Sequence, residues 1–444
     1  MSNTPLTYRK IFRFWLPLAA TWLMMAAEGP FLAAVIARMT AEKLNLAAYG
    51  VAYAFGLVAE SPVIMLMSAS TALCQDRTSY RHLRNFTLWL CLAVTLFLGL
   101  FLLPPVFDTV ARKILGLAPE VVDLTHSALA LLLPWAPAIG FRRFYQGILI
   151  ATHKTRRVAA ATILRLVGMS GTALCCYQLS SMNGAQVGAL ALSVGVTAEA
   201  LFTRYLAQTA ISEILQKQPA AEKSPMSYRQ IWDYYLPLAL TPFIGLSVHP
   251  LVTFFLGKSR NALESLAVMP VIYGLTFVFR ALGLSYQEVA IALIGENRAS
   301  YRKARNFAIG LGIFCTLCLG LIAFTPLAEF WFRDLSGLSQ TLSNFATPAL
   351  QVMATFPALT VLICWQRALL ITARVTRPVS FATGVEAVGI FSLLTVAMLY
   401  LSLNGALAAS IAYVIGRLMA IAVLQRPLKQ QKHNFIEAKV VAKS

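Results

Sequence analysis

Charged residues are scarce in this chain of 444 residues: they make up 12% of it, whereas soluble domains carry about 25%. Hydrophobic residues make up 58%, and the mean hydropathy is +0.68. Apolar stretches of roughly 20 residues recur from near the N-terminus to about Leu424. This composition excludes a sizeable soluble domain and indicates an all-α polytopic membrane protein.

The motifs of soluble enzymes are also missing. The sequence has no P-loop, no HExxH motif and no convincing cluster of metal ligands. We therefore expect neither catalytic residues nor a metal or cofactor, and ATP is not expected to be the direct energy source. A membrane-embedded transferase would need clustered acid, His or metal-ligating residues at a loop edge, and the sequence shows none.

Twelve membrane spans are predicted from the apolar stretches. They are 11–36, 46–73, 85–106, 124–150, 158–179, 185–214, 231–256, 264–294, 307–327, 344–371, 379–401 and 405–425. The two ends of the chain and the loops on their side carry 23 of the 37 Lys and Arg residues, and the opposite loops carry 7. This asymmetry predicts cytoplasmic termini in the cell (plasma or inner) membrane, and it argues against a nucleic-acid partner despite the net charge of +19.

The second half of the chain repeats the first at an offset of 220 or 221 residues. Matching segments include Tyr8-Arg9-Lys10-Ile11 with Tyr228-Arg229-Gln230-Ile231, Gln146 with Gln366, and Asn183-Gly184-Ala185 with Asn404-Gly405-Ala406. Because each half has six spans, both enter the membrane in the same orientation. A pseudo-two-fold axis along the membrane normal, with a cavity between the halves, is therefore predicted.

The repeat also predicts the domain organisation. An N-lobe of six membrane helices covers 1–214, a cytoplasmic linker covers 215–230, and a C-lobe of six helices covers 231–425. The basic tail 426–444 is expected to be solvated and held near anionic headgroups.

Ionisable residues inside the spans are the candidate site. They are Glu28, Glu60, Arg142, Arg143, Arg165, Glu199, His249, Arg280, Glu288, Glu386 and Arg417. Such groups usually face a bundle interior or a cavity and pair with one another. Glu60 matches Arg280 and Arg165 matches Glu386, so each half carries one acid and one base at matched sites. We expect the pairs Glu60–Arg165 and Arg280–Glu386, which either fix helix register or line the cavity.

Glu28 has no matching charge, because its equivalent is Val248. An unpaired buried carboxylate tends to take a proton, so Glu28 is predicted to couple transport to H⁺ or Na⁺ or to contact substrate. The alternative is a locally satisfied or headgroup-facing acid. Pro30 beside it, and Pro250 in the seventh span, are expected to bend their helices near the middle of the membrane.

Three further sets of residues have alternative interpretations. His249 either contacts substrate or bonds a backbone carbonyl. Arg142 and Arg143 point about 100° apart on a helix, so one faces the cavity, unless both extend to the membrane surface. Tyr53 and Tyr273 are expected to pack, although each has a hydroxyl to offer to the cavity.

These residues resemble a known family. Glu28, the helix end near Arg38 and the segment from Leu46 to Tyr53 resemble the first two helices of the drug/cation antiporters in the multidrug/oligosaccharidyl-lipid/polysaccharide exporter superfamily. Within it, Leu46 to Tyr53 is closer to the progressive ankylosis transporter family. The resemblance implies a V-shaped pair of six-helix lobes that exchanges inward-open and outward-open states. In the drug antiporters, acids of the first or seventh helix bind H⁺ or Na⁺, and only Glu28 carries over here.

Together these observations predict a monomeric secondary active exporter of small organic solutes. The resemblance to ankylosis transporters implies an anionic cargo such as citrate, nucleotides or pyrophosphate, which the arginines in the spans are compatible with. The alternatives are a drug/cation antiporter of the same fold, a flippase for lipid-linked substrates, and a membrane scaffold that transports nothing. The scaffold is disfavoured because it does not need unpaired charge in the middle of the membrane.

Overall fold

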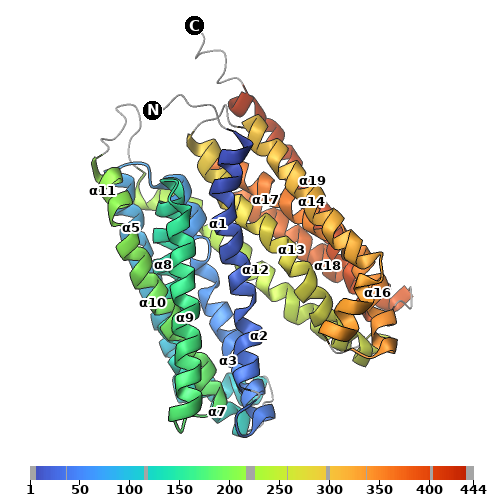
Figure 1. The fold of residues 1–444 in the computed structure, drawn as a ribbon. Helices are drawn as coiled ribbons and strands as arrows, with labels where there is room; N and C mark the ends of the chain where they lie inside the picture. The colour runs from blue at the N-terminus through green and yellow to red at the C-terminus, as the bar shows by residue number, and fades with distance from the viewer. Residues whose placement is uncertain are drawn as a thin grey trace. The chain divides into compact units, whose positions relative to one another are not determined.

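The structure is a computed structural model that describes residues 7–36, 38–114, 119–216, 226–257, 259–296, 301–336, 338–400 and 404–436. All regular structure in these ranges is helical (Figure 1). The longer helices are α1 (Tyr8–Ala26), α2 (Glu28–Ile36), α3 (Glu42–Glu60), α4 (Leu66–Leu73), α5 (Arg77–Phe101), α7 (Pro119–Leu131), α8 (Trp135–Ala151), α9 (Thr155–Leu179), α10 (Gly184–Leu206), α11 (Gln208–Gln216), α12 (Tyr228–Gly257), α13 (Ala262–Glu296), α14 (Tyr301–Ala323), α16 (Gln340–Met353), α17 (Phe356–Thr372), α18 (Arg377–Tyr400) and α19 (Gly405–Ile436). Short helices, α6 (Pro104–Asp108) and α15 (Leu327–Glu329), follow α5 and α14.

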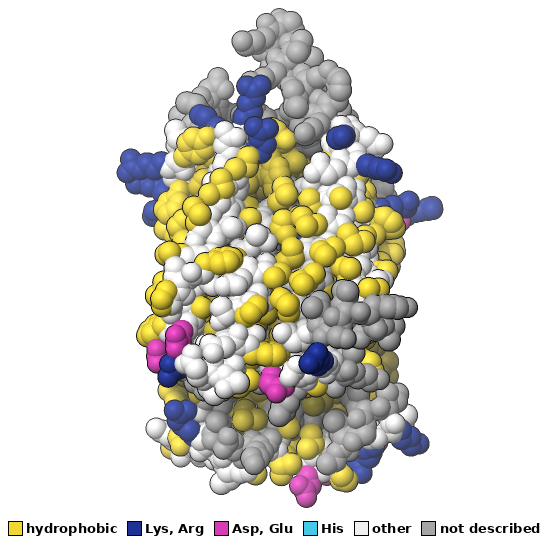
Figure 2. Space-filling view, turned by 90° about the vertical axis from the view of Figure 1, so that its right-hand side faces the viewer, with side chains coloured by type: hydrophobic (Ala, Val, Ile, Leu, Met, Phe, Trp, Pro, Cys, Tyr) yellow, Lys and Arg dark blue, Asp and Glu magenta, His cyan; other side chains and the backbone are white. Residues whose placement is uncertain are grey.

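Twelve segments of the described chain are long and apolar enough to cross a membrane, and each overlaps one predicted span. Figure 2 shows a face of the molecule whose middle is covered by hydrophobic side chains, with Lys and Arg lying toward its two ends. Large apolar side chains on the spans are accordingly exposed, including Trp89 and Leu317. The predicted all-α fold with twelve membrane helices is confirmed, and the chain is an integral membrane protein.

The chain forms two compact units. The N-terminal unit is Met24–Phe243, and the C-terminal unit combines Met1–Leu23 with Ile244–Ser444. These units divide the chain inside α1 and α12, whereas the predicted lobes divide it at the linker 215–230.

Aromatic residues at matched positions explain this difference. Trp15 of α1 donates from Nε1 to the carbonyl of Leu282 (3.2 Å) and packs its ring against Phe307 in the C-terminal unit. In the N-terminal unit, Tyr235 of α12 donates its hydroxyl to the carbonyl of Pro62 (2.6 Å) and packs against Phe86. The first turns of each repeat are thus held by the unit that the other repeat builds.

The first span is interrupted next to the predicted bend. Helix α1 ends at Ala26, and α2 begins at Glu28. Pro30 has no N–H to bond the carbonyl of Ala26, which explains the break. In the seventh span, α12 continues as one helix through residues 249 and 250. The side chains of Pro30, His249 and Pro250 lie outside the described residues.

Glycine permits a close crossing between the fifth and sixth spans of each half. A Cβ added at Gly195 of α10 would lie 3.0 Å from the carbonyl oxygen of Arg165 on α9 and 2.9 Å from the Cβ of Met169. A Cβ at Gly416 of α19 would lie 3.0 Å from the carbonyl oxygen of Glu386 on α18. Small residues allow membrane helices to approach in this way. The crossing places Arg165 and Glu386 directly against the sixth span of their own half.

We expect Gly195→Ala to lower the free energy of unfolding by about 1–3 kcal/mol, because the added methyl group overpacks the crossing. The control is Gly171→Ala on α9, where an added Cβ meets nothing within 4 Å and where alanine favours a helix over glycine. Thermal unfolding in detergent micelles compares the two variants. Equal melting temperatures would mean that α9 and α10 do not approach this closely.

Candidate functional site

A cluster of buried charged and polar side chains lies inside the N-terminal unit. This N-cluster consists of Glu28 on α2, the half-buried Glu60 on α3, Arg142, Arg143 and Gln146 on α8, Thr162 and Arg165 on α9, and Glu199 on α10. It contains three carboxylates and three guanidinium groups. All of these residues belong to candidate membrane spans.

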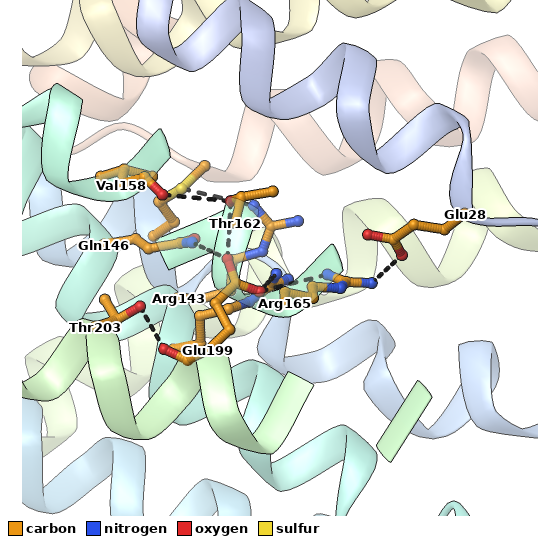
Figure 3. Close-up of polar contacts among 10 residues, drawn as sticks. Glu28, Arg143, Gln146, Val158, Thr162, Arg165, Glu199 and Thr203 are labelled. Carbon is orange, nitrogen blue, oxygen red and sulfur yellow. Dashed lines mark hydrogen bonds and ion pairs between the residues drawn. The ribbon is translucent and has the colours of Figure 1, made fainter. Parts of the chain in front are cut away.

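Glu199 is the centre of the N-cluster and is 0% exposed. Its Oε2 lies 2.5 Å from Nη1 of Arg142 and 3.6 Å from Nη1 of Arg165. Its Oε1 accepts from the hydroxyl of Thr162 (2.9 Å) and from Nε2 of Gln146 (3.1 Å) (Figure 3). A buried carboxylate is stable only with this degree of pairing and hydrogen bonding.

Glu28 has a partner, which corrects the prediction that it is unpaired. Nη2 of Arg165 donates to its Oε2, so Arg165 lies between Glu28 and Glu199 (Figure 3). The other carboxylate oxygen, Oε1, is buried and has no hydrogen-bond partner among the residues described. Glu28 is therefore half satisfied, with one oxygen left for a proton, a cation or a ligand.

The predicted pairs between the second and fifth spans are not the ones observed. Arg165 pairs with Glu28 and Glu199, and Glu386 pairs with Arg417. The reason is packing: α9 lies chiefly against α10, and α18 against α19, so the sixth span supplies the nearest partner. Glu60 lies within electrostatic range of Arg143, Arg142 and Arg165, with Arg143 having the largest effect.

A second charged cluster lies inside the C-terminal unit. This C-cluster consists of Arg280 on α13, Phe356, Thr360 and Arg367 on α17, Thr383 and Glu386 on α18, and Arg417 on α19. Nε of Arg417 lies 2.7 Å from Oε1 of Glu386, and Nη2 of Arg367 lies 2.9 Å from the hydroxyl of Thr383. The guanidinium groups of Arg280 and Arg417 each lie 4.8 Å from the ring centroid of Phe356, which is cation–π distance.

The two clusters have opposite polarity across the same pair of helices. The fifth span carries Arg165 in one half and Glu386 in the other, and the sixth span carries Glu199 and Arg417 respectively. Arg417 matches position 196 rather than 199, so the sixth-span residues differ by about one helical turn and lie on the same face. Each half therefore joins its fifth and sixth spans by an ion pair of reversed sign.

The clusters also differ in charge balance. The N-cluster has three arginines and three glutamates. The C-cluster has three arginines and one carboxylate, that of Glu386. Glu288 lies about two turns along α13 from Arg280, and counting it gives two carboxylates. Within the part of the chain that is described, Arg280 makes no hydrogen bond or ion pair, and its Nε is buried without an acceptor. With Glu288 counted, the C-cluster thus has one positive charge in excess.

Tyr53 and Tyr273, two further predicted site residues, pack against other aromatic rings. Tyr53 packs its ring against Tyr49 and Trp135, and Tyr273 packs edge-on against Tyr413 at 5.1 Å. A role of either hydroxyl in binding stays a prediction. Arg367 was not among the residues predicted from the sequence, because it is close enough to the end of α17 to be interpreted as extending to the membrane surface. Its buried Nε and its bond to Thr383 show that it points inward instead.

No group of three or more His, Cys, Asp or Glu side chains with metal-site geometry occurs among the described residues. The carboxylates of both clusters are surrounded by arginines, an environment that suits anions and protons better than a divalent metal.

No family model matches the sequence, and no curated protein does either. Solved structures do share its fold. A MOP superfamily transporter from Pyrococcus furiosus, whose binding pocket is described as of reverse polarity and suggestive of a different function, aligns with a TM-score of 0.75 at 17% identity over 96% of each chain. An outward-facing multidrug resistance MATE transporter gives 0.77 at 18% over 96% of each chain. A mutant of the Vibrio cholerae MATE transporter VcmN gives 0.74 at 15%, over 95% of this chain and 97% of that one. These structures do not test the closer resemblance to the progressive ankylosis family. They do show that the chain has the fold of the MATE transporters of the MOP superfamily.

Proposed function

We propose that this protein is a secondary active exporter that moves small organic anions, such as citrate or nucleotides, by alternating access. The transporter fold supports the general activity, and the observation that carries the anionic preference is the excess positive charge of the C-cluster. A guanidinium group stays protonated at any physiological pH. An unpaired one inside a membrane is costly, and a bound anion would supply the missing counter-charge.

We propose that Glu28 couples transport to the ion gradient. A proton or Na⁺ bound to Glu28 would neutralise its carboxylate and weaken its ion pair with Arg165. Arg165 would then pair with Glu199 alone. The charge of the N-cluster would then change by one as the ion binds. The free Oε1 of Glu28 supports this role, because an incoming ion finds a lone pair that no described residue occupies. In this scheme the transporter works as a monomer in the cell membrane with both termini cytoplasmic, an orientation that rests on the Lys and Arg asymmetry.

The experiment that tests the proposed function is uptake into proteoliposomes of labelled citrate, ATP and cationic dyes, with imposed pH and Na⁺ gradients. We expect gradient-driven movement of citrate or ATP and none of the dyes. Dye movement would make the protein a drug/cation antiporter. If none of these compounds were transported, a flippase for lipid-linked substrates would be favoured.

We expect Glu28→Gln to abolish the response of anion uptake to the imposed gradient, because glutamine cannot take up or release the coupling ion. Each pH unit supplies about 1.4 kcal/mol per coupled proton, which is a tenfold accumulation, and the variant should lose it. The control is Glu213→Gln on α11, which removes a carboxylate that is 54% exposed and pairs with Lys154. A Glu28→Gln variant that still accumulates substrate in step with the gradient would remove Glu28 from the coupling mechanism.

A further inference from the structure

A groove of about 390 Å³ lies on the C-terminal unit, between α14, α17 and α19. It runs along α14 from Arg305 to Ile313, roughly 12 Å at the rise of an α-helix. Ile309, Ile313 and Leu362 border it and are 53%, 55% and 40% exposed. These helices are candidate membrane spans, so the groove opens on a surface that faces the bilayer.

Comparison of the two repeats explains why the groove exists. At three lining positions, the C-terminal unit has a smaller side chain than the N-terminal unit has at the matching position. Helices α8 and α17 match at an offset of 221, so Ala308, Gly312 and Leu362 line the groove where Thr87, Cys91 and Phe141 occupy the matching positions. In the N-terminal unit Phe141 packs edge-on against Tyr145, and the guanidinium of Arg204 covers the Tyr145 ring at 5.2 Å. Gln425 stands where Arg204 does, so this cover is missing from the groove.

A buried polar side chain in the groove lacks a partner. Gln366 is 2% exposed and lines the groove; its Nε2 donates to the carbonyl of Ile421 (3.3 Å), and its Oε1 has no hydrogen-bond partner among the residues described. Gln146, which Gln366 matches in the sequence, bonds Glu199, and the equivalent of Glu199 in this unit is Ala420. In the structure Gln366 takes the place of Tyr145, since Trp365 packs on Tyr301 as Phe144 packs on Tyr80. Oε1 of Gln366 is therefore an acceptor for a hydroxyl group of a ligand.

The groove has a basic end and an apolar end. Arg305 and Lys429 line its basic end and are both exposed, and Tyr301 packs against Trp365 beside them. Its other end is lined by Gly312, Ile313 and other apolar residues. Two cations above an apolar slot of this length match a phosphate with an acyl chain attached.

We propose that this groove binds one anionic glycerophospholipid of the surrounding bilayer, of the phosphatidylglycerol type. The phosphate lies between Arg305 and Lys429, a hydroxyl of the glycerol headgroup donates to Gln366, and one acyl chain follows α14 toward Ile313. The lipid is favoured over a water-soluble ligand because the groove opens through exposed isoleucine and leucine side chains, which a bilayer covers with acyl chains.

The test is photolabelling of the full-length protein in nanodiscs with phosphatidylglycerol that carries a diazirine in its acyl chain, followed by peptide mapping. We expect labelling on α14 and α17 near Gly312 and Val361, and competition by unlabelled phosphatidylglycerol but not by phosphatidylcholine. Arg305→Gln with Lys429→Gln should weaken binding about thirtyfold. Arg81→Gln with Arg84→Gln, which removes the same charge from the N-terminal unit, should leave it unchanged.

Gly312→Phe is the second variant, because a Cβ added at Gly312 meets only Ala358, at 3.6 Å, and the phenyl ring fills the groove without altering its charge. It should abolish labelling of α14 and α17 while the melting temperature stays near that of the parent. Labelling that is spread evenly over the apolar surface, or that survives Gly312→Phe, would overturn the proposal. A dimer that Gly312→Phe dissociates would also overturn it, because a second copy would then be the occupant. Labelling that rises when residues 437–444 are deleted would overturn it too, because the tail would then be the occupant.

Discussion

Arg142→Met is expected to destabilise the protein by about 3–5 kcal/mol, the cost of removing one partner of a buried ion pair. The variant leaves Glu199, which is 0% exposed, with Thr162, Gln146 and the 3.6 Å contact from Arg165. Arg165 cannot compensate fully, since it also pairs with Glu28. The N-cluster would carry one uncompensated negative charge inside the membrane.

Equilibrium unfolding in mixed micelles measures this effect. The matched control is Arg112→Gln, whose pairs with Asp108 and Asp123 are exposed and should be worth less than about 1 kcal/mol. The double variant Arg142→Met with Glu199→Met should recover part of the loss, because neither buried charge then lacks its partner. Equal stabilities of Arg142→Met and Arg112→Gln would show that water reaches Glu199.

The membrane spans were predictable from the sequence because each depends only on a continuous stretch of residues. A run of about 20 apolar residues has one stable arrangement in a bilayer, a helix that satisfies its own backbone. The repeat was equally visible, since residues such as Gln146 and Gln366 keep their chemical identity at a constant spacing. Both features need only neighbours in the sequence or a simple offset.

The ion pairs were not predictable in the same way. A repeat shows which residues are equivalent, such as Arg165 and Glu386, but it does not show which helices touch. Contact between the fifth and sixth spans depends on Gly195 and Gly416, whose missing side chains let the helices approach. The partners Glu199 and Arg417 also differ by about one turn between the halves, so no constant offset relates them.

For a similar reason, the sequence did not predict which helices belong to each compact unit. Trp15 and Tyr235 occupy matched positions and each bonds a matched carbonyl, that of Leu282 or Pro62. The repeat predicts that these two environments are alike. It does not say that each aromatic residue lies in the unit built by the other half, because an exchanged and an unexchanged helix have the same sequence.

Arg280→Gln is expected to lower kcat/KM for anion uptake about a hundredfold, which corresponds to roughly 2.7 kcal/mol of lost transition-state binding. This is the size expected when one charged partner of a buried anion is removed. Arg280 is chosen because it makes no ion pair with any described residue and lies over the ring of Phe356. Arg280→Lys keeps the charge and should be impaired less, although a lysine lacks the planar fork of donors.

The stability of the same variant separates transport from folding. Arg142 neutralises a buried carboxylate, so its loss should destabilise the fold, whereas Arg280 is the surplus cation of the C-cluster and its loss removes a cost. We therefore expect Arg280→Gln to be as stable as the parent or more so, which is typical of residues kept for function at the expense of stability. Arg333→Gln, which breaks an exposed pair with Glu329, is the control for both measurements. If Arg280→Gln were destabilised like Arg142→Met and still carried anions at the parental rate, the C-cluster would be a structural ion network, and the excess charge would not be the substrate's counter-charge.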